Sequence, residues 1–446
     1  MMRDAPRGGR GPTNQIRMAT ATQRGLAPVR HVLDNGAVVI VKETATTPAV
    51  TISAALQAGS IYESSAQAGL AHFLSRVIDR GTEHRTGETI AEELDFRGVS
   101  LSINSTRHSQ VVSCTCLSED FQFVLGLIAE IISAPTMPED EIEKRRAEIL
   151  TGIRQDEDNP AVVAMEGLFA MLYPDGHPYG RPSKGTIETV ERIDRNALRA
   201  FHAARFAPSV LSLAIVGDVT VDRAAAAAAR MFSGWKARTP EPVGLASPPS
   251  GLLRRQSVVT MMNKSQADIT YGFTTVPRSD PSHDAFTLMN NALGQYSLGG
   301  RLGDSIRERQ GMAYYVFSSF DGTVIESPLV IRAGVNPANV DQAVASIDEE
   351  IANISRNGLR AEELADCKRY LIGSMPRMLE TNASIARFLQ TAEFFGLGMD
   401  YDVRLPALLE AVTLDQANAA ARTLAADHAA LVIAGPYPSF KGPEVS

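Results

Sequence analysis

Residues 69–82 read Gly-Leu-Ala-His-Phe-Leu-Ser-Arg-Val-Ile-Asp-Arg-Gly-Thr and carry a clear helical signal. The apolar residues recur at the spacing of one face of a helix, and Gly81 ends the run. His72 and Arg76 lie one helical turn apart, with Ser75 beside them. We therefore predict a helix with one packed face and with His72, Ser75 and Arg76 grouped together as candidate site residues.

Composition limits what the whole chain can be. With 446 residues, 44% of them hydrophobic and 21% charged, it is an ordinary globular sequence that is too long for a single core. The net charge of −8 and the lack of a Lys/Arg cluster argue against a general nucleic-acid binder. No apolar run approaches the length of a membrane span. The three cysteines, Cys114, Cys116 and Cys367, are expected to be buried and reduced.

The chain divides into a tail, two halves and a linker. Residues 1–26 are rich in Arg, Gly, Thr and Ala without the apolar core of a secretory signal, so a disordered tail is expected. An Arg-rich organelle presequence is the alternative, and a cytoplasmic protein is the preferred interpretation. Residues 236–251 contain four prolines and little apolar content, which indicates a linker. We expect domains at 27–236 and 252–446, with the linker at 237–251.

The second half repeats the pattern of the first. Residues 302–318 repeat the helix, glycine and strand of residues 90–105, and residues 359–372 repeat the charged helix at 138–150. The offset of roughly 212 to 221 residues indicates a duplicated domain and not a solenoid. Strands bunched beside helices, without strict alternation, predict an α+β protein. We expect two homologous α/β sandwich domains, each a mostly antiparallel sheet packed against helices.

Four segments, taken together in this order, form a recognisable pattern. They are Gly69–Leu74 with Arg80–Thr82, Lys144–Leu150 running to Asp156–Pro160, His177–Pro182, and Leu298–Leu302 running to Arg307–Tyr314. With these segments the sequence resembles the pitrilysin/insulinase-type metallopeptidases, the inverzincins with a His-x-x-Glu-His motif. The resemblance covers roughly residues 31–436 and implies two domains like those of mitochondrial processing peptidase.

The resemblance also implies where zinc ligands would stand. In the family, two histidines at i and i+4 and a downstream glutamate hold zinc, and the Glu between the histidines is the general base. Here those positions hold His72, Arg76 and Gly152, with Ser75 in the place of the base. A guanidinium repels a cation, and a serine hydroxyl is no base near neutral pH. Glu148 lies one helical turn before Gly152, off register. We expect a degenerate motif that holds no metal, with His72 a packed or surface histidine.

The second half retains the family's substrate-binding features. The resemblance assigns to Arg307 and Tyr314 the contacts with the substrate backbone beside the scissile bond, where a Tyr hydroxyl donates to an oxyanion. The alternative for these two is a surface arginine and a packed tyrosine. Tyr315 points to the other face of the strand. Gly299 and Gly300 stand in a loop that would let a substrate backbone come close.

In the first half, the family's peptide-binding edge strand aligns with residues 100–105. Active members often carry Asn-Ala where this chain has Ser102 and Ile103. This departure weakens the expectation of a substrate edge in the first half.

The first half has lost the zinc ligands, whereas the second half retains Arg307 and Tyr314. This difference predicts that the chain is the non-catalytic subunit of a heterodimeric zinc metallopeptidase. As in two-subunit bacterial members, zinc is expected on a homologous His-x-x-Glu-His partner, with a peptide as substrate. Three alternatives stay open: a structural or assembly protein like the core subunits of a respiratory complex, a homodimeric peptide binder, and an isolated active metallopeptidase. The sequence gives neither the substrate nor the identity of the partner.

Overall fold

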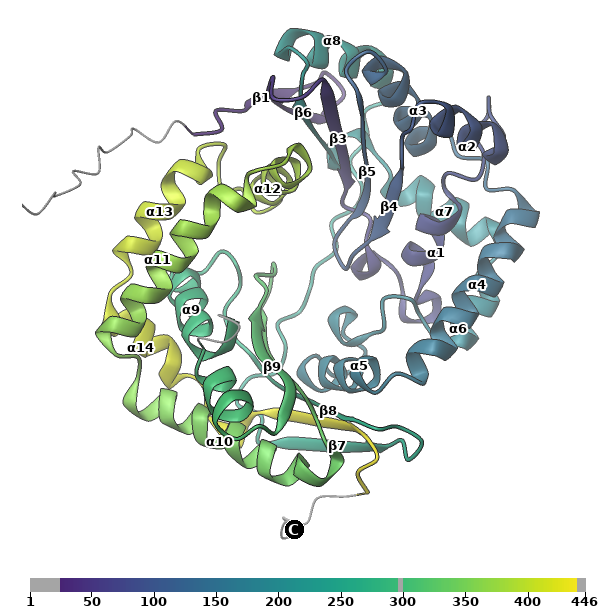
Figure 1. Ribbon diagram of the computed structural model, residues 1–446. Coiled ribbons are helices and arrows are strands. Elements are labelled where there is room, and N and C mark those ends of the chain that lie inside the picture. Colours follow the sequence, from purple (N-terminus) through teal and green to yellow (C-terminus); the bar gives the residue numbers. More distant parts are fainter. Residues whose placement is uncertain (1–24, 296–299, 439–446) are drawn as a thin grey trace, which may run out of the picture.

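The computed structural model describes residues 25–295 and 300–438 and contains two β-sheets, each covered by helices (Figure 1). The first sheet is built from residues 29–217 and the second from residues 255–435. Among the strands that the structure describes, seven of the nine pairings are antiparallel, and the other two, β2 with β6 and β7 with β11, are parallel. The predicted α+β class with mostly antiparallel sheets is confirmed.

The first sheet has six strands in the order β1-β2-β6-β3-β5-β4. Their sequences are β-branched and apolar where both faces are covered, as in β2, β3 and β6, and alternate with polar residues in β5. The strands are β1 (Val29–Val32), β2 (Val38–Glu43), β3 (Ala49–Leu56), β4 (Ser102–Ser105), β5 (Gln110–Leu117) and β6 (Leu211–Gly217).

The second sheet has five strands in the order β7-β11-β8-β10-β9. This order repeats β2-β6-β3-β5-β4 of the first sheet, with the parallel pair in the same place. The repeat in topology agrees with the repeat in sequence and makes β4 and β9 the equivalent edge strands. The strands are β7 (Arg255–Thr260), β8 (Ala267–Thr274), β9 (Ala313–Phe320), β10 (Pro328–Val335) and β11 (Ala430–Gly435).

The helices begin and end largely where caps and breakers place them. Thr86 caps α2 by accepting from the Thr89 N–H, and Asn159 caps α5, whose first residue is Pro160. The α-helices are α1 (Leu70–Val77), α2 (Gly87–Phe96), α3 (Phe121–Ser133), α4 (Glu139–Glu157), α5 (Pro160–Leu172), α6 (Ile187–Arg192), α7 (Arg195–Arg205), α8 (Val221–Phe232), α9 (His283–Asn290), α10 (Val340–Asn357), α11 (Ala361–Met378), α12 (Asn382–Phe394), α13 (Tyr401–Ala411) and α14 (Leu414–Arg422).

Several short helical segments differ from regular α-helix. The predicted helix at 302–310 is a π-helix, and α1 ends at Val77, before the glycine that was expected to stop it. The π-helical segments are η5 (Asn291–Gln295) and η6 (Gly303–Arg309). The 3-10 turns are η1 (Ser60–Tyr62), η2 (Ser65–Gln67), η3 (Pro178–Gly180), η4 (Pro208–Val210), η7 (Pro337–Asn339) and η8 (Ala426–His428).

The two halves exchange one helix each. Helix α5 belongs to the first half in sequence, yet it packs on β8 and β11 of the second sheet. Helix α12 belongs to the second half and packs on β3 and β6 of the first sheet. Figure 1 shows the halves curving toward each other, with α5 and α12 where they meet. Burying both helices ties the halves together by apolar contact.

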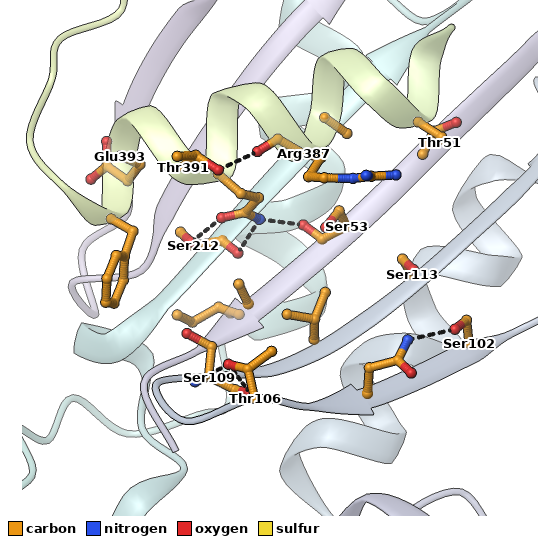
Figure 2. Close-up of a pocket in the computed structure, with 18 of the residues that line it drawn as sticks. Thr51, Ser53, Ser102, Thr106, Ser109, Ser113, Ser212, Arg387, Thr391 and Glu393 are labelled. Carbon is orange, nitrogen blue, oxygen red and sulfur yellow. Dashed lines mark hydrogen bonds between the residues drawn. The ribbon is translucent and has the colours of Figure 1, made fainter. Parts of the chain in front are cut away.

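Side-chain hydrogen bonds hold each exchanged helix in register. On α12, Gln390 Nε2 donates to the carbonyls of Ser53 at 2.7 Å and Ser212 at 3.0 Å (Figure 2). On the second sheet, Thr270 Oγ1 donates to the Ala164 carbonyl of α5 at 2.8 Å. Because backbone carbonyls at a buried contact need a donor, these bonds specify how each helix lies on the foreign sheet.

Further contacts tie the beginning of the described chain to the second half. The Leu26 N–H donates to Asp402 of α13 at 2.6 Å, and Arg30 forms a bidentate pair with Glu393 of α12 at 2.8 Å. All three cysteines are buried and free, as predicted. Among the described residues, no helix has both the length and the apolar character needed to cross a bilayer.

Candidate functional site

Helix α1 is positioned by a buried carboxylate that precedes it. The Glu63 side chain accepts hydrogen bonds from the backbone N–H groups of Gly69 at 2.9 Å and Ala71 at 2.8 Å. These groups are free at a helix N-terminus, so Glu63 takes the role of a capping residue. Gly69 has φ of +93°, and a Cβ there would collide with the Lys184 carbonyl. The start of α1 is therefore fixed by Glu63 and by a glycine that no other residue replaces without strain.

The Glu63 carboxyl makes stability depend on pH. Burial raises its pKa from 4.5 to about 7, against the opposing effect of the hydrogen bonds from Ala71 and Gly69. The folded chain then holds a proton that the unfolded chain has released, so the free energy of unfolding falls as pH rises from about 4.5 to about 7, by about 2 to 3 kcal/mol. Urea denaturation across this window is expected to show that slope in the wild type and a flatter one in Glu63→Gln. Equal slopes would contradict this assignment.

The three candidate residues of α1 lie in different surroundings. Ser75 is buried, and its hydroxyl donates to the His72 carbonyl at 2.6 Å. Arg76 is exposed and pairs with Glu148 of α4 at 3.4 Å. His72 is half-buried, and burial, followed by the charges of Lys184 and Arg76, lowers its pKa to about 4. At neutral pH, this face of α1 therefore offers one neutral imidazole beside two cations.

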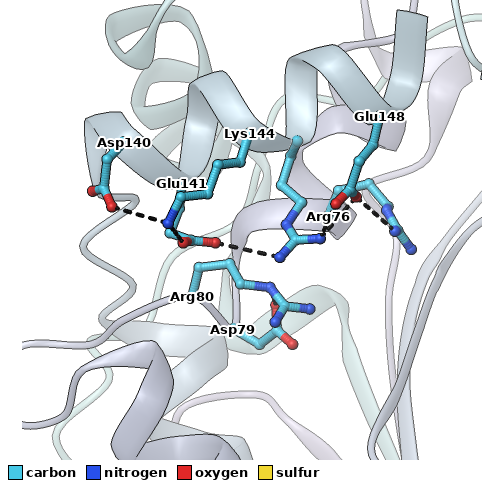
Figure 3. Close-up of polar contacts among 8 residues, drawn as sticks. Arg76, Asp79, Arg80, Asp140, Glu141, Lys144 and Glu148 are labelled. Atoms are coloured by element: carbon cyan, nitrogen blue, oxygen red, sulfur yellow. Dashed lines mark hydrogen bonds and ion pairs between the residues drawn. The ribbon is translucent and has the colours of Figure 1, made fainter. Parts of the chain in front are cut away.

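Helix α4 faces α1 with a network of alternating charges, shown in Figure 3. Glu148 accepts from Arg145 at 2.6 and 2.7 Å as well as from Arg76. One turn after Glu148, Gly152 has open space where a Cβ would stand. Near the helix start, Lys144 pairs with Glu141 at 2.6 Å. The carboxylate nearest to Arg76 is thus neutralised by two guanidinium groups.

These residues do not fit a zinc centre. Zinc sites of this kind need two imidazoles and a carboxylate converging on one point. His72 offers one nitrogen, the Arg76 guanidinium occupies the second ligand position, and Lys184 lies close enough to lower the pKa of His72. Among the residues that the structure describes, no three His, Cys, Asp or Glu side chains are grouped to hold a metal ion.

Arg307 and Tyr314 lie on either side of one tight turn at the edge of the second sheet. Arg307 is in η6, and its carbonyl accepts from the Gly311 N–H at 3.0 Å, where Gly311 adopts φ of +62°. Tyr314 follows in edge strand β9 and is 61% exposed. Arg307 is exposed too, and its Nε lies 3.6 Å from Glu308. Both side chains are therefore accessible to solvent, one on each side of the turn that leads from η6 into edge strand β9.

Tyr315 points away from Tyr314, as strand alternation predicts. Its hydroxyl makes a short hydrogen bond to buried Asp268, which also accepts from Gln266 at 3.2 Å. Burial, followed by the bond to Asp268, raises the pKa of Tyr315. Tyr315 is therefore committed to the protein interior, whereas the Tyr314 hydroxyl has no hydrogen-bond partner among the described residues.

Of the two loop glycines, Gly299 lies outside the described residues, whereas Gly300 is buried. A Cβ on Gly300 would come within 2.8 Å of the Cα of Gly294. Glycine at position 300 thus permits a close backbone crossing inside this loop. Its contact with substrate stays a prediction.

The edge strand of the first sheet begins at Ser102, two residues after the predicted start. Ser102 and Asn104 are exposed, with Asn104 Nδ2 donating to Ser102 Oγ at 2.8 Å, and Ile103 packs against the core. Helix α1 packs beside this strand. The first sheet therefore offers an open edge next to the face that carries His72.

Sequence reasoning missed the partners that surround His72 and α1. Glu63 lies six residues before the Gly69 N–H that it binds, outside the range of capping motifs. Lys184, which makes a short ion pair with Asp156 of α4, approaches His72 from a loop more than one hundred residues later. Of the residues near His72, only Glu148 could be placed beside the zinc frame from the sequence, because it stands one helical turn before Gly152.

Family models match both halves of the chain. Residues 38–183 match the insulinase (peptidase family M16) model, and residues 192–371 match the model described as the peptidase M16 inactive domain. An uncharacterized zinc protease of Mycobacterium leprae is 27% identical over 94% of each chain. One of Bacillus subtilis is 25% identical over 91% of this chain and 98% of its own.

Solved structures agree with the fold. A peptidase M16 inactive domain from Pseudomonas fluorescens has a TM-score of 0.86 and 25% identity, and covers 94% of this chain and 100% of its own. A protease from Helicobacter pylori has a TM-score of 0.83 at 17% identity over 92% of this chain and 99% of its own, a likeness of fold alone. The duplicated sheets, the degenerate zinc frame and these matches lead to one conclusion. The chain belongs to the insulinase, or pitrilysin, family of M16 peptidases and is a homologue of its zinc proteases.

Proposed function

We propose that this chain is the non-catalytic subunit of a heterodimeric zinc metallopeptidase. The observation that carries the proposal is a difference between the two halves of the chain. The zinc frame on α1 and α4 holds Arg76 and Gly152 instead of ligands, whereas Arg307 and Tyr314 are exposed at the edge of the second sheet. A chain with substrate-binding groups but no metal ligands needs a partner that supplies the metal.

In this proposal the partner is a homologous chain that carries His-x-x-Glu-His and binds the zinc. Tyr314 would donate a hydrogen bond from its hydroxyl to the developing oxyanion of the peptide, and Arg307 would hold a neighbouring carbonyl. Both roles need side chains that are free of other partners. The exposure of Tyr314 and the weak 3.6 Å contact of Arg307 with Glu308 support this requirement.

Co-purification from the cells that make this chain tests the proposal. We expect a tagged chain to bring down a homologue of similar size with an intact His-x-x-Glu-His motif, identified by mass spectrometry, and the pair to cleave peptides in a chelator-sensitive way. A large assembly without a zinc-bearing homologue would instead support a structural role. Recovery of a peptide-binding homodimer would also contradict the proposal.

A further inference from the structure

Edge strand β9 carries one extra residue where it pairs with the end of β10. In this pairing Tyr315 stands opposite Gly334. The next matched pair is Ala313 with Val335, which lies two residues along β9 but only one along β10. Tyr314 is therefore the extra residue of a β-bulge, which interrupts the regular alternation of side chains between the two faces. Bulges redirect side chains beside active sites, and here the redirected residue is the oxyanion donor of the proposed function.

A row of three residues crosses the second sheet at this bulge. Asp268 of β8 stands opposite Gly334 of β10, which in turn stands opposite Tyr315 of β9. The Tyr315 hydroxyl reaches over Gly334 and makes its short hydrogen bond to the buried Asp268 carboxylate. A Cβ at position 334 would collide with the Tyr315 ring. Glycine at this position therefore opens the path that lets the ring span from one strand to the next but one.

The row is anchored at its hydrogen bond and along the tyrosine ring. Gln266 Nε2 donates to both oxygens of Asp268 at 3.2 Å. The ring of Tyr315 packs beside that of Phe317, with 5.9 Å between the ring centroids. Because a buried carboxylate that loses a donor is costly, these contacts favour the register in which Tyr315 faces Asp268. The exposed Tyr314 side chain takes its direction from the bulge that this register creates.

We propose that Tyr315 and Asp268 are positioning residues for Tyr314. Their hydrogen bond fixes Tyr315 as the residue paired with Gly334, and so leaves Tyr314 as the exposed member of the bulge. Without this bond the bulge is free to move by one residue along β9, and such a shift turns side chains to the other face of a strand. Tyr314 would then keep its hydroxyl but lose its direction. The effect on turnover rests on the proposed function, whereas the direction of Tyr314 is a property of this chain alone.

Spin labelling of the full-length chain, without any partner, tests the bulge. Tyr314→Cys supplies the label site, and the three native cysteines are buried, so a nitroxide reagent reacts at position 314. We expect the electron paramagnetic resonance spectrum to show a more mobile label when Tyr315→Phe or Asp268→Asn is added. Tyr271→Phe is the matched control, because it removes a hydroxyl bond of 2.9 Å to Asp348 on the opposite face of β8. An unchanged spectrum in Tyr315→Phe, or an equal change in Tyr271→Phe, would overturn the inference.

Turnover of the complex with the zinc-bearing partner tests whether the bulge matters for catalysis. Tyr315→Phe should lower kcat by about tenfold to a hundredfold with KM unchanged, as a displacement of a catalytic group by about 1 Å does. Because Tyr315 acts through Tyr314, the same substitution should cost nothing further in a chain that already carries Tyr314→Phe. Additive losses, or full kcat in Tyr315→Phe, would overturn the positioning role. The proposed function fails by a different result, which is full turnover with Tyr314→Phe, and the labelling experiment does not depend on it.

Discussion

Tyr314→Phe is expected to lower kcat of the complex with its zinc-bearing partner by about a hundredfold to a thousandfold, the typical effect of removing one oxyanion donor. The substitution removes a single hydroxyl that is exposed and has no partner among the described residues. Stability should therefore change by less than about 0.5 kcal/mol, and thermal unfolding checks this. Because the hydroxyl acts only in the transition state, kcat and kcat/KM should fall together.

Arg307→Ala is expected to act differently, because a guanidinium that holds a substrate carbonyl binds the ground state as well. We expect KM to rise about tenfold or more with a smaller loss in kcat. Arg309→Ala is the matched control, since Arg309 is exposed on the same segment and pairs with Asp304 at 3.0 Å. Full activity of both Tyr314→Phe and Arg307→Ala complexes would contradict the assigned roles.

The second prediction with a large expected effect is that the double variant Arg76→His/Gly152→Glu gains the ability to bind zinc. The double substitution supplies the second imidazole and the carboxylate, with His72 already neutral because its pKa is about 4. The open space at Gly152 accepts a longer side chain, and the change at position 76 removes a cation. We expect one zinc per chain by metal analysis, and zinc at a hundred times Kd to stabilise the variant by about 2.7 kcal/mol.

Arg76→Gln/Gly152→Gln is the matched control, because it removes the same cation and fills the same space without supplying ligands. It should bind no zinc. If the His/Glu variant also stays free of zinc while folding normally, the geometry of α1 and α4 has diverged along with the ligands. Adding Ser75→Glu to the His/Glu variant would supply the missing base, although buried Ser75 leaves little room for a longer side chain.

Periodicity and breakers were enough to predict most elements of this fold. The apolar spacing within residues 69–82 located α1, and the repeat of helix, glycine and strand anticipated the repeated strand order. Periodicity reports that a face is buried but not which surface buries it. The exchange of α5 and α12 between the halves was therefore invisible in the sequence, although both helices were apolar enough to require a cover.

The candidate site was predictable only where a motif fixed its members. The frame around His72 and Arg76 located α1 and its missing ligands, and strand alternation separated Tyr314 from Tyr315. The row that crosses β8, β10 and β9 at the bulge had no such signal. Its three members are far apart in the sequence, so only the pairing of these strands brings them together.

The central claim, that this chain completes the active site of a zinc-bearing homologue, is tested most directly by titration. The peptidase activity of a fixed amount of the purified homologue is measured as this chain is added. We predict activity that rises and saturates at one chain per homologue, with Tyr314→Phe binding at the same ratio but leaving activity near the starting level. Activity that is complete before any chain is added, and unchanged by it, would contradict the account.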